Sequence, residues 1–176
     1  MSQHARGVGL RRLPADEIGR TFPGLTEDLL DWIRDSGAAR GFRDEAAMRE
    51  QVGMAVENAG FSSTETVHVA EVTGRRVGIL VGRVSRHRGE RAGSITWMAV
   101  DPAHRRRGIG AALVRHFAVG RGFLHLRGHV DAEDPVAAGF WAARGWTPDA
   151  AGERFLWVGP VPTWRPLPTS AEAAGG

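Results

Sequence analysis

Residues 100–114 read VDPAHRRRGIGAALV, and this stretch decides the fold that we expect. A hydrophobic segment ends at Val100, and three consecutive arginines then precede Gly108-Ile109-Gly110 and an apolar helical pattern. A glycine-containing turn at the start of a helix leaves several backbone N–H groups without intrahelical partners, at the positive end of the helix dipole. Such a turn binds phosphate groups, and the arginines add positive charge beside it. The sequence therefore predicts a phosphorylated cofactor at this turn.

Two common classes of phosphate-binding loop do not fit these residues. A loop that binds a nucleoside triphosphate needs Lys followed by Ser or Thr after its glycines, and the chain contains no Lys. A dinucleotide fingerprint needs G-x-G-x-x-G, and Gly108-Ile109-Gly110 lacks the third glycine. The cofactor is therefore expected to belong to another class.

A third pattern, R-x-x-G-x-G, does fit, with Arg105, Gly108 and Gly110 at its fixed positions. A second block, DPVAAGFWAARGW, follows at residues 134–146. The two blocks resemble the coenzyme A pyrophosphate loop and the later helix of the GCN5-related N-acetyltransferase (GNAT) superfamily. The later helix of the family usually reads Asn-x-x-Ala-x-x-(Leu/Phe)-Tyr-x-(Lys/Arg)-x-Gly-Phe. In this chain those positions hold Asp134, Ala137, Phe140, Trp141, Gly145 and Trp146.

The resemblance implies a fold and an activity. The fold is an α/β (α+β) architecture with a mixed, mostly antiparallel sheet of six to seven strands, flanking helices, and fourth and fifth strands that are parallel and splayed. The activity is transfer of an acetyl group from acetyl-CoA to a primary amine, by direct attack of the amine on the thioester. A non-catalytic acyl-CoA-binding sensor or regulatory module of the same fold remains as the alternative.

The resemblance also implies which residues bind coenzyme A. The backbone of three strand residues pairs with the pantetheine arm, and one N–H there stabilises the developing oxyanion. The pyrophosphate lies on the glycine turn. The implied cofactor-binding residues are Met98, Ala99, Val100, Arg105, Arg106, Arg107, Gly108, Ile109, Gly110, Ala111, Asp134 and Phe140.

The chain departs from the family pattern at Trp141, where many relatives carry a Tyr that protonates the departing sulfur. An indole N–H donates a hydrogen bond but keeps its proton near neutral pH, and the chain has no Tyr. Either the thiolate leaves with hydrogen-bond help alone or the protein is not a competent acetyltransferase. Trp141 is equally well explained as a core aromatic beside Phe140, and Asp134 as a helix cap.

Our first candidate for the general base is His129, at the end of a predicted strand and close to Asp131 and Glu133. Glu71 is the second candidate, and His125, His104 and His68 are equally titratable. No metal site is predicted, because His125 and His129 lack a third ligand. Four acidic residues of the front helices offer a binding surface for a cationic amine, although solvated helix faces explain them too: Asp28, Asp31, Asp35 and Glu45.

Composition predicts one domain, residues 7–159, with residues 1–6 and 160–176 as flexible or draped termini. The 176 residues contain no Cys, and the 23 basic residues are all Arg, which is typical of a GC-rich genome. Acidic residues are dispersed among the arginines, so nucleic-acid binding is not expected. Without an apolar run of signal-peptide or membrane-span length, a cytoplasmic protein with no membrane partner is expected. A homodimer through the C-terminal strands stays open.

The spacing of apolar residues, together with the Pro, Gly and Asp residues that end helices and strands, predicts the order of elements. Pro14 and Asp16 end the first strand, and Gly60 closes the second helix. The expected strands are 8–13, 66–72, 77–84, 94–100 and 123–130, with a closing hairpin over 147–158, and the expected helices are 25–35, 44–58, 108–119 and 135–144.

Overall fold

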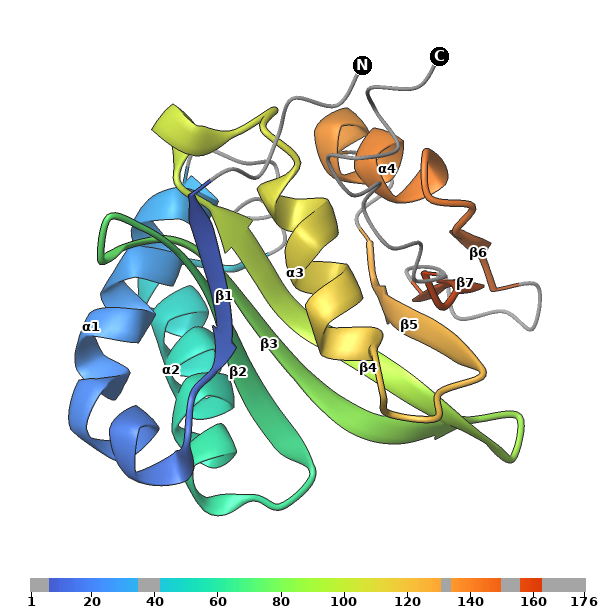
Figure 1. The fold of residues 1–176 in the computed structure, drawn as a ribbon, viewed down its shortest axis with the longest axis horizontal. Coiled ribbons are helices and arrows are strands. Elements are labelled where there is room, and N and C mark those ends of the chain that lie inside the picture. The colour runs from blue at the N-terminus through green and yellow to red at the C-terminus, as the bar shows by residue number, and fades with distance from the viewer. Residues whose placement is uncertain (1–6, 35–41, 131–133, 150–155, 163–176) are drawn as a thin grey trace, which may run out of the picture.

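A seven-stranded mixed sheet in the order β1-β2-β3-β4-β5-β7-β6 forms the centre of the structure, which is a computed structural model (Figure 1). The structure describes residues 7–34, 42–130, 134–149 and 156–162. Its strands are β1 (Val8–Arg12), β2 (Glu65–Val72), β3 (Arg75–His87), β4 (Glu90–Val100), β5 (His125–His129), β6 (Thr147–Pro148) and β7 (Leu156–Pro160).

The β4–β5 pair is parallel, and every other neighbouring pair in the sheet is antiparallel. The helix α3 (Ile109–Ala118) connects β4 to β5, as a parallel connection requires. The predicted mixed sheet with parallel fourth and fifth strands is confirmed.

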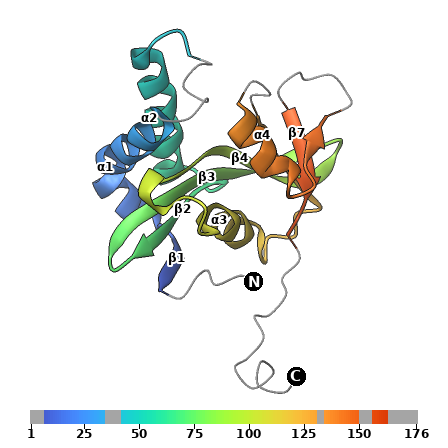
Figure 2. The same ribbon diagram turned by 90° about the horizontal axis from the view of Figure 1, so that it is seen from above.

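Helices cover both faces of the sheet (Figure 2). The helices α1 (Ala15–Arg34) and α2 (Glu45–Phe61) pack on one face against Val67 and Val69 of β2. The helix α3 and Trp141 of α4 (Pro135–Ala142) belong to the core on the opposite face, which includes Ala70 of β2. Because side chains alternate between faces along a strand, each long strand supplies both cores.

The structure corrects the start of the first helix, which we expected near Leu25. The helix begins at Ala15, directly after Pro14, whose carbonyl oxygen accepts hydrogen bonds from the N–H groups of Glu17 (3.1 Å) and Ile18 (3.0 Å). Pro23 lies inside the helix. Ile18 is buried in the core with Leu25 and later residues, so apolar packing along the whole helix outweighs the break that a proline favours.

The structure also corrects the end of the second helix. Gly60 does not close α2, which continues to Phe61 and ends at the cap residue Ser62, whose N–H donates to the carbonyl oxygen of Asn58 (2.8 Å). Asp44 caps the other end, because its carboxylate accepts the N–H of Ala47 (2.8 Å). Ala59 packs into the core, and the helix extends three residues past its predicted end.

At the C-terminal side, β6 and β7 form the expected antiparallel pair, with Thr147 opposite Val158. The strand β7 continues to Pro160, and Val161 packs against the core around α3. The folded chain therefore passes the expected boundary at residue 159. Of the predicted termini, 1–6 and 160–176, residues 1–6 and 163–176 lie outside the described residues. Among the residues that the structure describes, no helix is both long and apolar enough to cross a membrane.

Candidate cofactor and acceptor site

The strands β4 and β5 part at their C-terminal ends. They pair from Ala92 opposite His125 to Ile95 opposite Gly128. Beyond this point β4 continues to Val100, and among the described residues the pairing of this part of β4 is with β3 alone, with Val100 opposite Gly78. The splay expected from the sequence is therefore confirmed, and one edge of β4 faces the gap.

The backbone at this edge is free to pair with an extended ligand. The N–H of Asp101 donates to the carbonyl oxygen of Val77 in β3 (3.0 Å). Because hydrogen-bonding direction alternates along an antiparallel strand, the N–H of Ala99 also points to β3. The N–H groups of Met98 and Val100 then point into the gap. Of the three predicted strand residues, these two therefore offer a donor to the gap.

The turn that precedes α3 has the form of an anion-binding loop. Gly108 is the N-terminal cap residue of α3, with a φ of 79°, and no side chain caps its N–H groups. Arg106 also adopts a positive φ, 65°, which a residue with a side chain rarely does. The first intrahelical bond at this end joins the N–H of Ala112 to the carbonyl oxygen of Gly108 (3.0 Å). The N–H groups of Ile109, Gly110 and Ala111 therefore precede it and remain available to an anion.

The three arginines of the loop have different environments. The Arg105 guanidinium donates to the carbonyl oxygens of Val100 (3.1 Å) and Trp32 (2.8 Å). It ties the loop to the end of β4 and to α1. Arg106 and Arg107 are exposed, and neither pairs with a described carboxylate. They supply the free positive charge of the loop.

Gly110 is a glycine because α4 approaches it closely. A Cβ at this position would lie 3.1 Å from a ring carbon of Phe140 and 3.7 Å from the terminal methyl of Met98. Close packing therefore accounts for a glycine at this position. The guanidinium of Arg144 lies over the Phe140 ring, 3.5 Å from its centroid. Met98, Gly110 and Phe140 are therefore brought together beside the gap.

Asp134 and Trp141, two of the residues that depart from the family pattern, have structural roles. Asp134 is 4% exposed and caps the helix, because one carboxylate oxygen accepts the N–H groups of Val136 (3.0 Å) and Ala137 (3.1 Å). Trp141 is 8% exposed, with its ring centroid 4.2 Å from that of Trp146 and 4.8 Å from that of Phe140. Capping and core packing thus account for both residues in this structure.

The two candidate bases lie in different places. His129 is exposed and ends β5, one residue beyond Gly128 where the strands part. Glu71 lies on β2, which β3 separates from β4, and its carboxylate is bound by Arg11 (2.9 Å), which also binds Glu17 (2.8 Å). The structure places His129 at the gap and Glu71 away from it.

The other histidines are engaged elsewhere. His104 contacts Asp101 (3.1 Å), His68 lies under α3 against His116 (2.9 Å), and His125 starts β5 at the end remote from the gap. Among the described residues no three potential metal ligands form a group.

The acidic residues of the front helices are neutralised by arginines. Asp28 pairs with Arg76 (2.8 Å), and Arg34 pairs with both Asp31 (2.5 Å) and Glu45. Asp35 lies outside the described residues. The expected surface of free carboxylates for a cationic amine is therefore not found at these three positions.

An aromatic pair on the α1 and α2 face was not predicted from the sequence. The rings of Phe42 and Trp97 stack, with centroids 5.7 Å apart and planes at 26°. Trp97 is the β4 residue next to Met98 and lies just beyond the point where the strands part. The sequence offered one indication of this pair, because Trp97 directly precedes the predicted pantetheine-binding residues.

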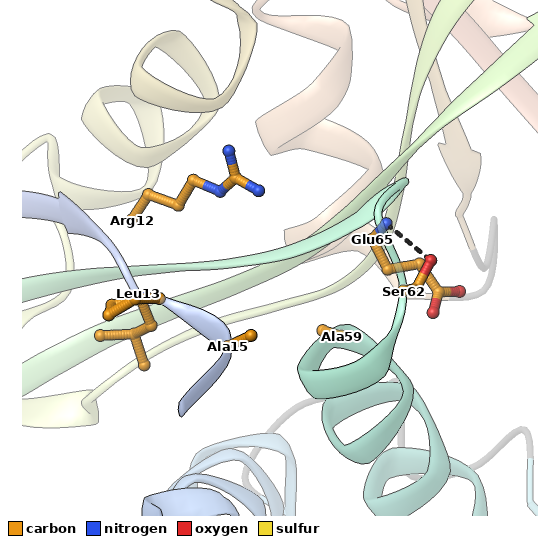
Figure 3. A pocket seen from close by; sticks show the side chains of 7 residues that line it. Arg12, Leu13, Ala15, Ala59, Ser62 and Glu65 are labelled. Carbon is orange, nitrogen blue, oxygen red and sulfur yellow. Dashed lines mark hydrogen bonds between the residues drawn. The ribbon is translucent and has the colours of Figure 1, made fainter. Parts of the chain in front are cut away.

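Two cavities of about 320 Å³ each lie away from the gap. The first is lined by residues of β1, α1, α2 and β2, among them Arg12, Ser62 and Glu65 (Figure 3). The second lies between α1 and α2 and includes Ile18 and Phe22. Neither contains a residue of the glycine turn or of the parted strands. The cofactor site is instead an open strand edge next to a helix N-terminus.

Comparison with solved structures shows what this fold is similar to. The PaiA N-acetyltransferase of Thermoplasma acidophilum, in complex with coenzyme A, superposes with a TM-score of 0.65 at 13% identity, over 87% of this chain and 98% of that one. A GCN5-related N-acetyltransferase of Ralstonia eutropha JMP134 gives 0.64 at 21% identity, over 84% and 97%. The aminoglycoside acetyltransferase meta-AAC0020, from an uncultured soil metagenomic sample and in complex with sisomicin, gives 0.54 at 20%, over 92% and 97%.

A search of curated proteins finds no match. A family model does match: residues 63–148 fit the acetyltransferase (GNAT) domain. This range runs from the start of β2 through the parted strands, the glycine turn and α4 to β6. This part of the chain is therefore similar to the acetyltransferase (GNAT) domain, and the chain shares the fold of the solved acetyltransferases.

Proposed function

We propose that this protein transfers an acetyl group from acetyl-CoA to the primary amine of a small molecule or peptide. The observation that carries the proposal is the unpaired edge of β4 directly beside the uncapped N-terminus of α3. A helix N-terminus binds the phosphates of a ligand whose extended arm can then pair with the strand edge. Few ligands other than coenzyme A combine these two parts.

The residues of the gap fit this cofactor. Arg106 and Arg107, with the N–H groups of Gly108 to Ala111, would hold the pyrophosphate, and the backbone of Met98 to Val100 would pair with the pantetheine arm. The bound cofactor supplies a thioester as the acetyl donor. The N–H of Met98 would donate a hydrogen bond to the thioester carbonyl oxygen, where negative charge would develop during attack.

The acceptor must lose a proton before or during the attack. An alkyl ammonium has a pKa of about 10.4, so a neighbouring group has to accept this proton near neutral pH. His129 is our candidate because it is exposed and is the first residue of β5 past the parting point. Glu71 is not assigned this role, since Arg11 binds its carboxylate.

The departing sulfur has to leave without a strong acid beside it. A thiol with a pKa of about 8.5 leaves tolerably well as the thiolate. The indole N–H of Trp141 can donate a hydrogen bond but not a proton. We therefore propose a reaction in which His129 handles the proton of the amine and no residue protonates the sulfur.

A non-catalytic acyl-CoA-binding module is the second candidate, and the burial of Trp141 against Trp146 favours it. Release of free thiol from acetyl-CoA, measured with a panel of primary amines, separates the two. The enzyme releases thiol with at least one amine. A binding module binds coenzyme A tightly in calorimetry and shows no release with any amine.

A further inference from the structure

We infer that the acceptor is a single amine carried on an apolar, preferably aromatic, carbon skeleton, and not a polycation. The inference rests on the proposed function and names the substrate class of the same site. Its basis is the stacked pair of Phe42 and Trp97, together with the neutralised carboxylates around it.

The two ligands reach the gap from opposite faces of the sheet. The glycine turn and α3 lie on one face, where Met98 and Val100 pack with the core around α3. Trp97 and Ala99 alternate with them and pack with the core of α1 and α2 on the other face. Because the cofactor phosphates occupy the α3 face, the acceptor has to approach from the face of Trp97.

On that face the surface next to the gap is aromatic. Phe42 and Trp97 are each partly buried and pack against the α1 and α2 core. Trp97 is adjacent in sequence to Met98, whose N–H we assign to the thioester carbonyl. An aromatic ring offers both a stacking surface and attraction for one ammonium group at its face.

The charges on the same face do not suit a molecule with several ammonium groups. Each described carboxylate of α1 already pairs with an arginine, as does Glu45 in the first turn of α2. The α1 pairs are Asp16 with Arg20, Glu17 with Arg11, Glu27 with Arg49, Asp28 with Arg76 and Asp31 with Arg34. At these positions, among the described residues, a polyamine or an aminoglycoside would have to displace an arginine from each carboxylate.

The test measures thiol release from acetyl-CoA with tryptamine and 2-phenylethylamine on one side and with spermidine and sisomicin on the other. We expect kcat/KM to be at least tenfold higher for the arylalkylamines. In Trp97→Ala the KM for tryptamine rises at least tenfold, while the Kd for coenzyme A stays within twofold. Trp97→Phe, which keeps a stacking surface and guards against a folding defect, recovers most of the loss.

Phe61→Ala serves as the matched control, because Phe61 is a largely exposed aromatic at the end of α2 and outside the proposed site. Phe61→Ala should leave kcat/KM, the KM for tryptamine and the Kd for coenzyme A unchanged. Higher kcat/KM for spermidine or sisomicin would overturn the inference and leave the acetyltransferase proposal standing, as would an unchanged KM for tryptamine in Trp97→Ala.

Thiol release with no amine at all would instead contradict the proposed function. In that case calorimetry with tryptamine and protein saturated with coenzyme A decides the inference. Binding that weakens in Trp97→Ala supports it, and absence of binding refutes it.

Discussion

At the scale of single residues, the conformation of the proposed cofactor loop depends most on Gly108. Its φ of 79° is strained for any residue with a side chain, and it forms the uncapped start of α3. In Gly108→Val the Kd for coenzyme A should rise about 100-fold, which corresponds to about 2.7 kcal/mol. Isothermal calorimetry measures this change.

Gly120 provides the control for that substitution, because it has a similar φ of 72° after the end of α3 and open space around it. Gly120→Val should cost comparable stability through the same backbone strain. Its affinity for coenzyme A should stay within twofold of the original protein. Equal weakening in both variants would mean that strain, and not the loop, sets the affinity.

His129 is the residue on which the proposed chemistry depends most. In His129→Gln, kcat should fall about 100-fold or more, the usual effect of removing a general base, whereas the Kd for coenzyme A should not change. Steady-state kinetics with the best amine of the panel provide the measurement. An unchanged kcat would remove His129 from the mechanism.

Asp134 tests whether a helix cap, and not a contact to the cofactor, accounts for its role. Asp134→Ala removes the acceptor for the N–H groups of Val136 and Ala137 and should cost about 1 kcal/mol of unfolding free energy. Asp134→Asn can still cap and should lose much less. Urea unfolding of the two variants distinguishes them, and equal losses would contradict the capping assignment.

At the scale of elements, the unit from β4 through the glycine turn to α3 was predicted closely from the sequence, because its signals are local. Pro102, Gly108 and the helical period of α3 all act within a few residues. The start of α1 was not predictable in the same way, since Pro14 and Pro23 read as breaks while burial of Ile18 depends on the packing of α2 and the sheet. The engagement of Arg105 with Trp32 likewise joins segments far apart in the sequence.

The packing of α3 on β2 buries a pair of histidines. His68 is 2% exposed, and its Nδ1 lies 2.9 Å from Nδ1 of His116, while Thr66 lies 3.1 Å from its Nε2. Burial, which has the largest effect, and the charges of His116, Arg121 and Arg12 together lower the pKa of His68 to about 3. Burial also lowers the pKa of His116. Both rings are therefore neutral in the folded protein.

The buried pair makes stability depend on pH. Below a pH of about 6.5 the unfolded chain binds protons at these histidines that the folded chain does not bind. The free energy of unfolding should therefore decrease as pH falls from about 6.5 toward 3, by at most about 1.4 kcal/mol per pH unit for His68. Urea unfolding at pH 7.5 and 5.0 should show a smaller decrease in His68→Leu than in the original protein. Equal decreases would contradict the assignment.

At the scale of the whole molecule, the sheet separates two approaches to one gap. The α3 face holds the glycine turn, and the α1 and α2 face holds Trp97. The family resemblance predicted the gap, but the aromatic surface and the neutralised carboxylates were visible only in the folded chain. The reason is that the ion pairs join different elements: Arg34 of α1 pairs with Glu45 of α2, and Asp28 of α1 pairs with Arg76 of β3. Sequence spacing gives no measure of such pairing.

Hydrogen exchange with and without coenzyme A tests the central claim most directly, because the claim concerns individual backbone N–H groups. We predict that the cofactor slows exchange at Met98 and Val100 and at residues 106–111, and leaves the amides of β1 and α2 unchanged. Slowed exchange confined to other segments, such as those lining the two cavities, would contradict the account.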